Sequence, residues 1–151
     1  MRQQRIRPEF VESAPRQLSE GVIYISDRFR TALHKCCCGC GQEVVTPLNP
    51  AGWSYQREGG TVTIKPSIGN WSFPCKSHYL IIRNEIVWAR GMTDRQIATV
   101  KARDARDKQK YIDECNKNKS SDDRLLGRTA PNSEHSLLSR LGALFNGWWS
   151  K

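Results

Sequence analysis

The sequence predicts a mainly β fold of the α+β class: a small antiparallel β-meander followed by a C-terminal helix and a tail. Two observations support this prediction. Residues 21–91 contain short runs of β-branched and aromatic residues separated by Gly, Pro and Asn, which is typical of strands and turns. Residues 92–135 are largely polar, and the 151-residue length fits one domain with tails.

The strands of the predicted domain, residues 21–91, follow from local composition. They are expected at 21–26, in the segment through Leu33, at 44–45, at 53–55, at 61–64 and within 79–89. Glu58-Gly59-Gly60 predicts the turn of a hairpin, and Arg83-Asn84-Glu85 predicts a second turn. Pro66–Trp71 is expected to be a loop. Residues 1–20 carry two prolines and several charges, so we expect an N-terminal arm or a short edge strand.

The segment after the β domain divides into three parts. Residues 92–115 are expected to form a helix, because Thr93-Asp94-Arg95-Gln96 fits a capping box. Residues 116–135 are polar and are expected to be a flexible linker. Residues 136–151 form an amphipathic tail helix in this prediction, which either docks on the domain or contacts a partner or membrane surface. No apolar run approaches the roughly 20 residues needed to cross a bilayer.

Cysteine and histidine gather in two short clusters of the sequence. His34-Lys35-Cys36-Cys37-Cys38-Gly39-Cys40-Gly41 is the first, and Cys75-Lys76-Ser77-His78 is the second. Soft ligands supplied by one turn and a later C-x-x-H are typical of a tetrahedral zinc site, around which the meander would be built. The candidate ligands are Cys36, Cys38, Cys40, Cys75 and His78, which leaves five side chains for four places. A bound ion would also stabilise a domain too small for a large core.

The alternative role for these cysteines is in disulfides. The N-terminus has charge but no apolar segment typical of a secretory signal, so we expect a cytoplasmic protein with reduced thiols. Cys115 lies apart from the clusters and is expected to play no part.

Chemistry at the zinc site depends on how many ligands the protein supplies. A site with four protein ligands is structural, whereas a catalytic zinc keeps one position open. Thiolate-rich sites favour the structural role, so a reaction would need neighbouring groups such as Ser67 or Ser77 with His34 or His78 as base. Ser77 has an alternative role, which is to hydrogen-bond a zinc thiolate. The Gly69 and Asn70 amides are candidate oxyanion donors.

The formal net charge of +9 is the remaining compositional signal. Lys and Arg alternate with Asp and Glu along the whole chain, whereas a dedicated nucleic-acid-binding protein concentrates positive charge on one face. An acidic partner, either nucleic acid or protein, remains a candidate.

Three motifs resemble those of a known bacterial family. They are Ala32–Gly41, which matches A-x-H-x-C-x-C-G-C-G; a P-S-I loop at Pro66–Ile68; and Cys75–Tyr79, which matches C-x-S-H-[YF]. The family comprises zinc-binding domains of unknown function in operons for ubiquitin-like conjugation, and some members look like serine peptidases. Its usual proline is replaced here by Cys37, and the chain after about residue 116 has no counterpart in it.

The resemblance implies a zinc-stabilised, serine-type peptidase that acts on a ubiquitin-like modifier or its conjugates, in a bacterial defence or phage system. It also implies Ser67, His34 and His78 as candidate catalytic residues. The alternative is a non-catalytic zinc module that binds a protein or nucleic acid, and a further one is a phage-encoded accessory protein with the same fold.

Overall fold

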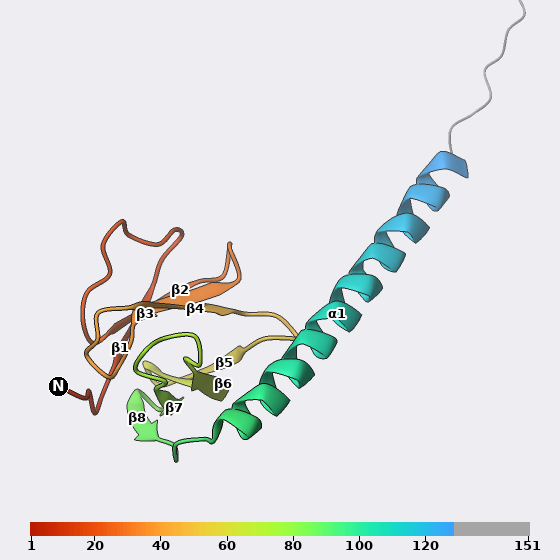
Figure 1. Ribbon diagram of the computed structural model, residues 1–151. Helices are drawn as coiled ribbons and strands as arrows, with labels where there is room; N and C mark the ends of the chain where they lie inside the picture. Colours follow the sequence, from red (N-terminus) through yellow and green to blue (C-terminus); the bar gives the residue numbers. More distant parts are fainter. Residues whose placement is uncertain (129–151) are drawn as a thin grey trace, which may run out of the picture. The chain divides into compact units, whose positions relative to one another are not determined.

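The computed structural model describes residues 1–128, with side chains to Lys119. This part of the chain forms eight strands and one helix (Figure 1). In chain order they are β1 (Arg7–Phe10), β2 (Val22–Ser26), β3 (Thr31–Lys35), β4 (Glu43–Pro47), β5 (Ser54–Glu58), β6 (Thr61–Gly69), β7 (His78–Ile82), β8 (Glu85–Trp88) and α1 (Asp94–Arg128). The predicted mainly β fold with a C-terminal helix is confirmed.

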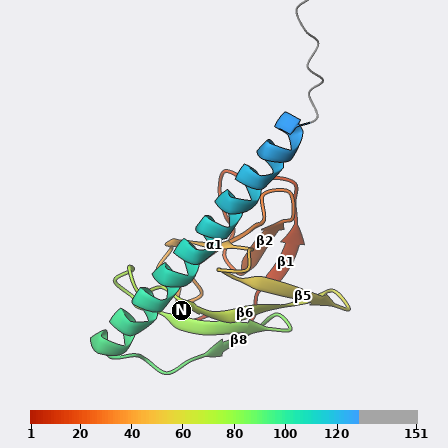
Figure 2. The ribbon, with the colours of Figure 1, turned by 90° about the vertical axis from the view of Figure 1, so that its right-hand side faces the viewer.

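The strands form two four-stranded sheets, in the orders β1-β2-β3-β4 and β5-β6-β7-β8. Figure 2 shows β1 and β2 in one layer and β5, β6 and β8 in the other. All neighbours pair antiparallel except β1 and β2, which pair parallel with Arg7 opposite Val22. The segment 1–20 thus contributes the edge strand β1. Two-residue turns connect β5 to β6 and β7 to β8, and a longer loop, residues 70–77, connects β6 to β7.

One hydrophobic core lies between the two sheets. It is built from alternate residues of each strand, as a half-buried sheet requires. Ile23, Ile25 and Ala32 come from the first sheet, and Val62, Ile64, Tyr79 and Ile81 come from the second. Cys36 and Cys37 belong to the same core, so the first cysteine cluster lies at its margin.

The turn between β7 and β8 shows how local sequence sets the register. Arg83 and Asn84 both have positive φ, at 49° and 69°. This two-residue, left-handed conformation matches the twist of a hairpin. The Asn84 side chain also accepts a hydrogen bond from Val62 N–H at 2.8 Å, which ties the turn to β6. The predicted turn at Arg83–Glu85 is confirmed.

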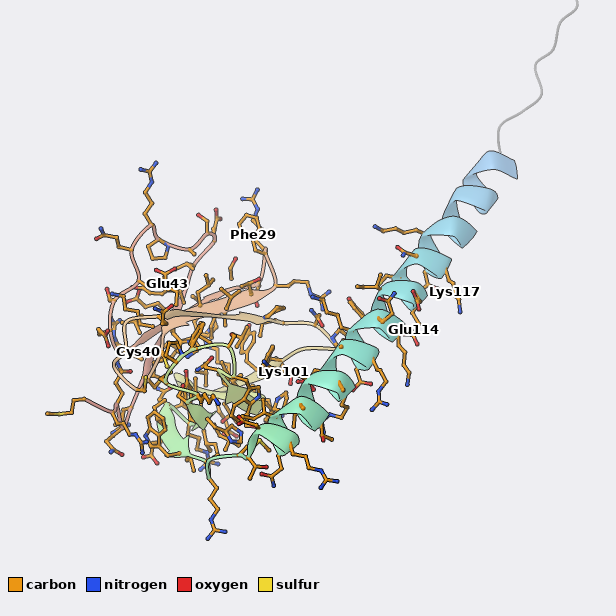
Figure 3. All side chains as sticks on the ribbon, viewed as in Figure 1. Phe29, Cys40, Glu43, Lys101, Glu114 and Lys117 are labelled. Atoms are coloured by element: carbon orange, nitrogen blue, oxygen red, sulfur yellow. The ribbon has the colours of Figure 1, made fainter. Side chains whose placement is uncertain are left out.

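The helix α1 begins as the sequence predicts. Gln96 N–H donates to Thr93 Oγ1 at 3.3 Å and Thr93 N–H donates to Gln96 Oε1 at 2.9 Å, which confirms the capping box. Ile97 is the one buried residue between 94 and 119, and residues 101–110 are all exposed. Figure 3 shows the side chains of α1, including Lys101, pointing outward from its axis.

The end of α1 differs from the prediction. The helix continues past Cys115 to Arg128, so the first part of the expected linker 116–135 is helical. Lys, Arg and Leu in this segment have good helix propensity, and the next proline is Pro131. The rest of the linker and the predicted tail helix 136–151 lie outside the described residues. In the described part of the chain, no helix combines the length and apolar content needed to cross a membrane.

Candidate metal centre and catalytic pair

Four of the five predicted zinc ligands converge on one point. The Sγ atoms of Cys36, Cys38, Cys40 and Cys75 all lie within 4.8 Å of one another. The Sγ–Sγ separations include 3.4 Å for Cys36–Cys38, 3.7 Å for Cys40–Cys75 and 4.0 Å for Cys36–Cys75. A tetrahedral ion with metal–sulfur bonds of about 2.3 Å needs sulfur atoms about 3.8 Å apart. The cluster therefore has the dimensions of a four-thiolate metal site.

Two tight turns bring these thiols together. Gly39 N–H donates to Cys36 O at 3.0 Å, and Gly39 has φ of 83°. A Cβ at Gly39 would lie 2.8 Å from the Met1 nitrogen, so the close passage of the N-terminal segment adds a second requirement for glycine. In the other turn, Lys76 N–H donates to Phe73 O at 3.0 Å, which carries Cys75 toward the first turn. Cys40 is exposed at the surface of the β domain (Figure 3).

The electrostatic environment differs among the four thiols. Burial raises the pKa of Cys36 and of Cys38. Burial acts the same way at Cys75, but hydrogen bonds from the Ser77 backbone and from the neighbouring side chains together outweigh it and lower the pKa to about 7. A bound cation favours the thiolate form of every ligand, and a coordinating thiol loses its proton. The hydrogen-bond donors around the cluster suit that form.

The two remaining cysteines lie outside the cluster. Cys37 points into the core, is fully buried, and has its pKa raised by burial to about 12. It therefore stays a neutral thiol at physiological pH. Cys115 is on α1 and is not one of the four clustered cysteines.

The fifth predicted ligand, His78, is paired with Ser67 instead. His78 Nε2 lies 3.0 Å from Ser67 Oγ, and His78 Nδ1 lies 3.2 Å from the backbone oxygen of Arg90. A carbonyl oxygen only accepts, so this contact assigns the proton to Nδ1 and leaves Nε2 as an acceptor for the serine hydroxyl. The Trp71 ring packs against the imidazole with centroids 4.9 Å apart. Both ring nitrogens are thus used, and the ring is fixed in orientation.

A register shift in β6 presents Ser67. Ile64 pairs with Ile81 and Ile68 with Tyr79, so β6 contains extra residues between these two pairs. Such irregularities reorient side chains and are frequent beside active sites. The predicted loop at Pro66–Trp71 is wrong as far as Gly69, because β6 resumes pairing with β7 after the shift and continues to Gly69.

Neighbouring side chains hold this part of β6 in place. The Trp53 indole Nε1 donates to Ser67 O at 3.4 Å. A Cβ at Gly69 would collide with the Trp71 indole, so glycine is needed to let that ring approach the strand. Trp71 therefore contacts the strand that carries the serine and the ring of the histidine.

Ser67 and His78 open into a groove of about 730 Å³. Its walls are mostly apolar and include Trp53, Pro66 and Leu80, with Lys65 at the same site. A concave, largely apolar surface with a few convergent polar groups is typical of a ligand site. The serine hydroxyl and the histidine ring are accessible to a bound substrate there.

Two other candidates, His34 and Asn70, have different surroundings from those expected, whereas Ser77 lies where it can hydrogen-bond a cluster thiol. His34 is fully buried, its Nε2 lies 2.8 Å from Tyr79 Oη, and burial lowers its pKa to about 4. Within residues 1–128, no hydrogen bond joins His34 to Ser67. The Asn70 amide, expected as an oxyanion donor, instead donates to Ser77 O at 2.9 Å. Ser77 Oγ lies 3.1 Å from Cys36 Sγ, beside the metal cluster.

Comparison with protein families gives a match over residues 10–89 to BubE, described as the bacterial ubiquitination-like system serine protease. The chain belongs to the BubE family. The matched segment contains all four clustered cysteines together with Ser67 and His78, and it ends before α1. Comparisons with curated proteins and with solved structures gave no match.

The BubE description agrees with the resemblance found in the sequence. It names a serine protease, and the described residues contain a serine paired with a histidine at an accessible groove. The pairing of Ser67 with His78 rather than His34 could not be predicted from the motifs. Both histidines flank cysteines in the sequence, and only the neighbouring strands β6 and β7 bring His78 to Ser67.

Proposed function

We propose that the β domain is a zinc-stabilised serine peptidase that acts on a ubiquitin-like modifier or its conjugates. The observation that carries this proposal is the 3.0 Å contact between Ser67 Oγ and His78 Nε2, with His78 Nδ1 held by the Arg90 carbonyl. A nucleophile, a base and a group that orients the base are the components of nucleophilic acyl transfer.

The reaction follows from these positions. His78 Nε2 accepts the Ser67 proton as Oγ attacks the scissile carbonyl carbon, and a tetrahedral intermediate forms. The imidazolium then protonates the leaving amine, which gives an acyl-enzyme on Ser67. Water, deprotonated by His78, attacks the acyl carbon, and His78 returns the proton to Ser67. The Arg90 carbonyl orients the ring but carries no full charge, so it stabilises the imidazolium less than a carboxylate would.

Zinc has a structural role in this proposal. Cys36, Cys38, Cys40 and Cys75 would hold it with four thiolates, and such a closed site has no position for water or substrate. His78 is then the base, and the zinc-ligand role considered for it from the sequence is not needed. The ion would fix the turn before β7, the strand that begins at His78.

The family description supports the substrate class, because it places BubE in a bacterial ubiquitination-like system. The groove suits an extended polypeptide segment, since Trp53, Pro66 and Leu80 offer apolar contacts next to the nucleophile. A cytoplasmic location in a bacterial cell fits four reduced thiols, which oxidising compartments would convert to disulfides.

A fluorophosphonate probe, which modifies activated serines, tests the proposal. We expect one adduct per chain on Ser67, located by mass spectrometry, and none in Ser67→Ala. Ser54→Ala is the matched control, because Ser54 lines the same groove without a histidine partner in the described contacts. Cleavage of a ubiquitin-like modifier extended at its C-terminus should show the same dependence. Zinc-loaded wild type that is neither labelled nor active would leave the non-catalytic binding module as the function.

A further inference from the structure

We propose that Asn70 is a positioning residue that couples the cysteine cluster to the catalytic pair through Ser77. This inference rests on the proposed peptidase function. Asn70 follows directly on β6, which carries Ser67, and Ser77 directly precedes His78. Both residues are only 7% exposed, so their hydrogen bonds are shielded from water.

Asn70 connects twice to Ser77. Its backbone N–H donates to Ser77 O at 2.9 Å, which extends the ladder one rung beyond the Gly69–His78 pair. Its side-chain Nδ2 donates to Ser77 Oγ, also at 2.9 Å. The strand end that carries the nucleophile is therefore bound to the strand end that carries the base by both main chain and side chain.

The hydrogen bonds are donated from Asn70 to Ser77 and from Ser77 to the candidate metal ligand Cys36. An amide NH₂ group only donates, so Ser77 Oγ accepts from Asn70 and its own proton is available to Cys36 Sγ at 3.1 Å. Asn70 Nδ2 also lies 3.6 Å from the same sulfur. Two donors directed at one buried sulfur are suited to an anionic, metal-bound thiolate.

A second branch fixes the amide itself. Asn70 Nδ2 lies 3.4 Å from Tyr79 Oη, and Tyr79 Oη lies 2.8 Å from His34 Nε2. Tyr79 and His34 are both fully buried. The amide is thus held between the core and the cysteine cluster, and this gives the buried His34 of the first motif a role as support for Tyr79.

The position of the Cys36 thiolate is transmitted by this network to the two strand ends. When the thiolate is held by the ion, Ser77 and Asn70 are held with it, and His78 stays within hydrogen-bond reach of Ser67. A displacement of about 1 Å at a reacting group can cost about 10²-fold in rate. Asn70 acts on the reaction only through Ser77 and touches no reacting atom.

The first test is the rate at which a fluorophosphonate labels Ser67 in zinc-loaded, full-length protein. We expect Asn70→Ala and Ser77→Ala each to lower this rate about 10- to 100-fold while one zinc per chain is retained. The double variant should be no slower than the slower single variant, because both remove the same connection. Thr46→Val is the control: it removes another buried hydrogen bond, from Thr46 Oγ1 to Ala32 O at 2.8 Å, and should label at the wild-type rate.

The second test replaces zinc with cobalt and follows the thiolate-to-cobalt charge-transfer band. Removing donors from the Cys36 sulfur should shift this band in Asn70→Ala and Ser77→Ala but not in Thr46→Val. Labelling of Asn70→Ala at the wild-type rate, or additive losses in the double variant, would overturn the positioning role. A wild-type protein that is not labelled at all would overturn the peptidase function itself, and the positioning role with it.

Discussion

The cysteine cluster and the Ser67–His78 pair both adjoin the end of β6 and the start of β7, but they differ in accessibility. The cluster is closed: four sulfur atoms within 4.8 Å point at one centre, and Cys36 is fully buried. The pair is open: its serine and histidine lie in contact at a groove of about 730 Å³. A closed set of ligands serves stability, because it leaves nothing for a substrate to contact, whereas an open pair can react.

This difference predicts different consequences of substitution. If the cluster holds the proposed ion, losing one of its cysteines removes an ion whose binding is coupled to folding. In the proposed peptidase, losing one member of the open pair removes a proton acceptor or a nucleophile and leaves the core between the sheets unchanged. Substitutions at each site can therefore show whether that site serves stability or reactivity.

The largest effect is expected from loss of the ion. Chelation, Cys38→Ser or Cys75→Ser should unfold the β domain, because structural zinc supplies about 10–16 kcal/mol of apparent binding energy against a typical domain stability of about 5–15 kcal/mol. Cys115→Ser should change the free energy of unfolding by less than about 0.5 kcal/mol. Zinc analysis and thermal melting measure both. Equal melting temperatures for the three cysteine variants would contradict the closed site.

Ser67→Ala should abolish chemistry without affecting the fold. We expect loss of at least about 10³-fold in activity, as for nucleophiles in serine peptidases. Zinc content and melting temperature should match those of the wild type, because Ser67 is only partly buried and contributes no sulfur ligand. Cleavage kinetics and melting curves give the two readouts. Retained cleavage would show that the groove is not the catalytic site.

His78→Gln distinguishes the two roles considered for this histidine. As a base, His78 is needed for turnover. Removing one member of a catalytic unit costs about as much activity as removing another, so activity should fall about as far as in Ser67→Ala. The zinc content should remain one per chain. A fall in zinc content with unfolding would show instead that His78 is a ligand.

The thiols outside the cluster should differ in reactivity. Burial raises the pKa of Cys37 to about 12, so its thiol stays protonated at pH 8. Cys115 is partly exposed on α1. In zinc-loaded protein, iodoacetamide should therefore modify Cys115 first and Cys37 only after denaturation, as peptide mapping would show. Rapid modification of Cys37 would indicate that the core around this residue becomes accessible to solvent in the native protein.

The smallest effect on both sites is expected from removing residues 129–151. The two sites lie within Met1–Asp113, which forms a compact unit by itself. A chain ending at Arg128 should keep its zinc and its Ser67 labelling, with a melting temperature within a few degrees of wild type. Any partner or membrane binding by the apolar residues of 136–149 should be lost in vesicle flotation and sedimentation. A large fall in melting temperature would assign those residues to the core.

Local sequence was sufficient to predict several features of this protein. Alternating β-branched residues predicted most strands, Thr93 and Gln96 predicted the start of α1, and the cysteine motifs predicted the convergence of the thiols. These features depend on spacings of a few residues, where backbone geometry and ligand chemistry act directly. The same short motifs were enough to identify the family.

Which side chains work together depends on the tertiary structure instead. The register shift between Ile64 and Ile68 turns Ser67 toward the groove, and pairing of β6 with β7 places His78 rather than His34 at 3.0 Å from it. Strand pairing across a sheet depends on the packing of the whole core, which no local pattern specifies. For the same reason, the sequence could not show that Asn70 bonds to Ser77 instead of facing the groove.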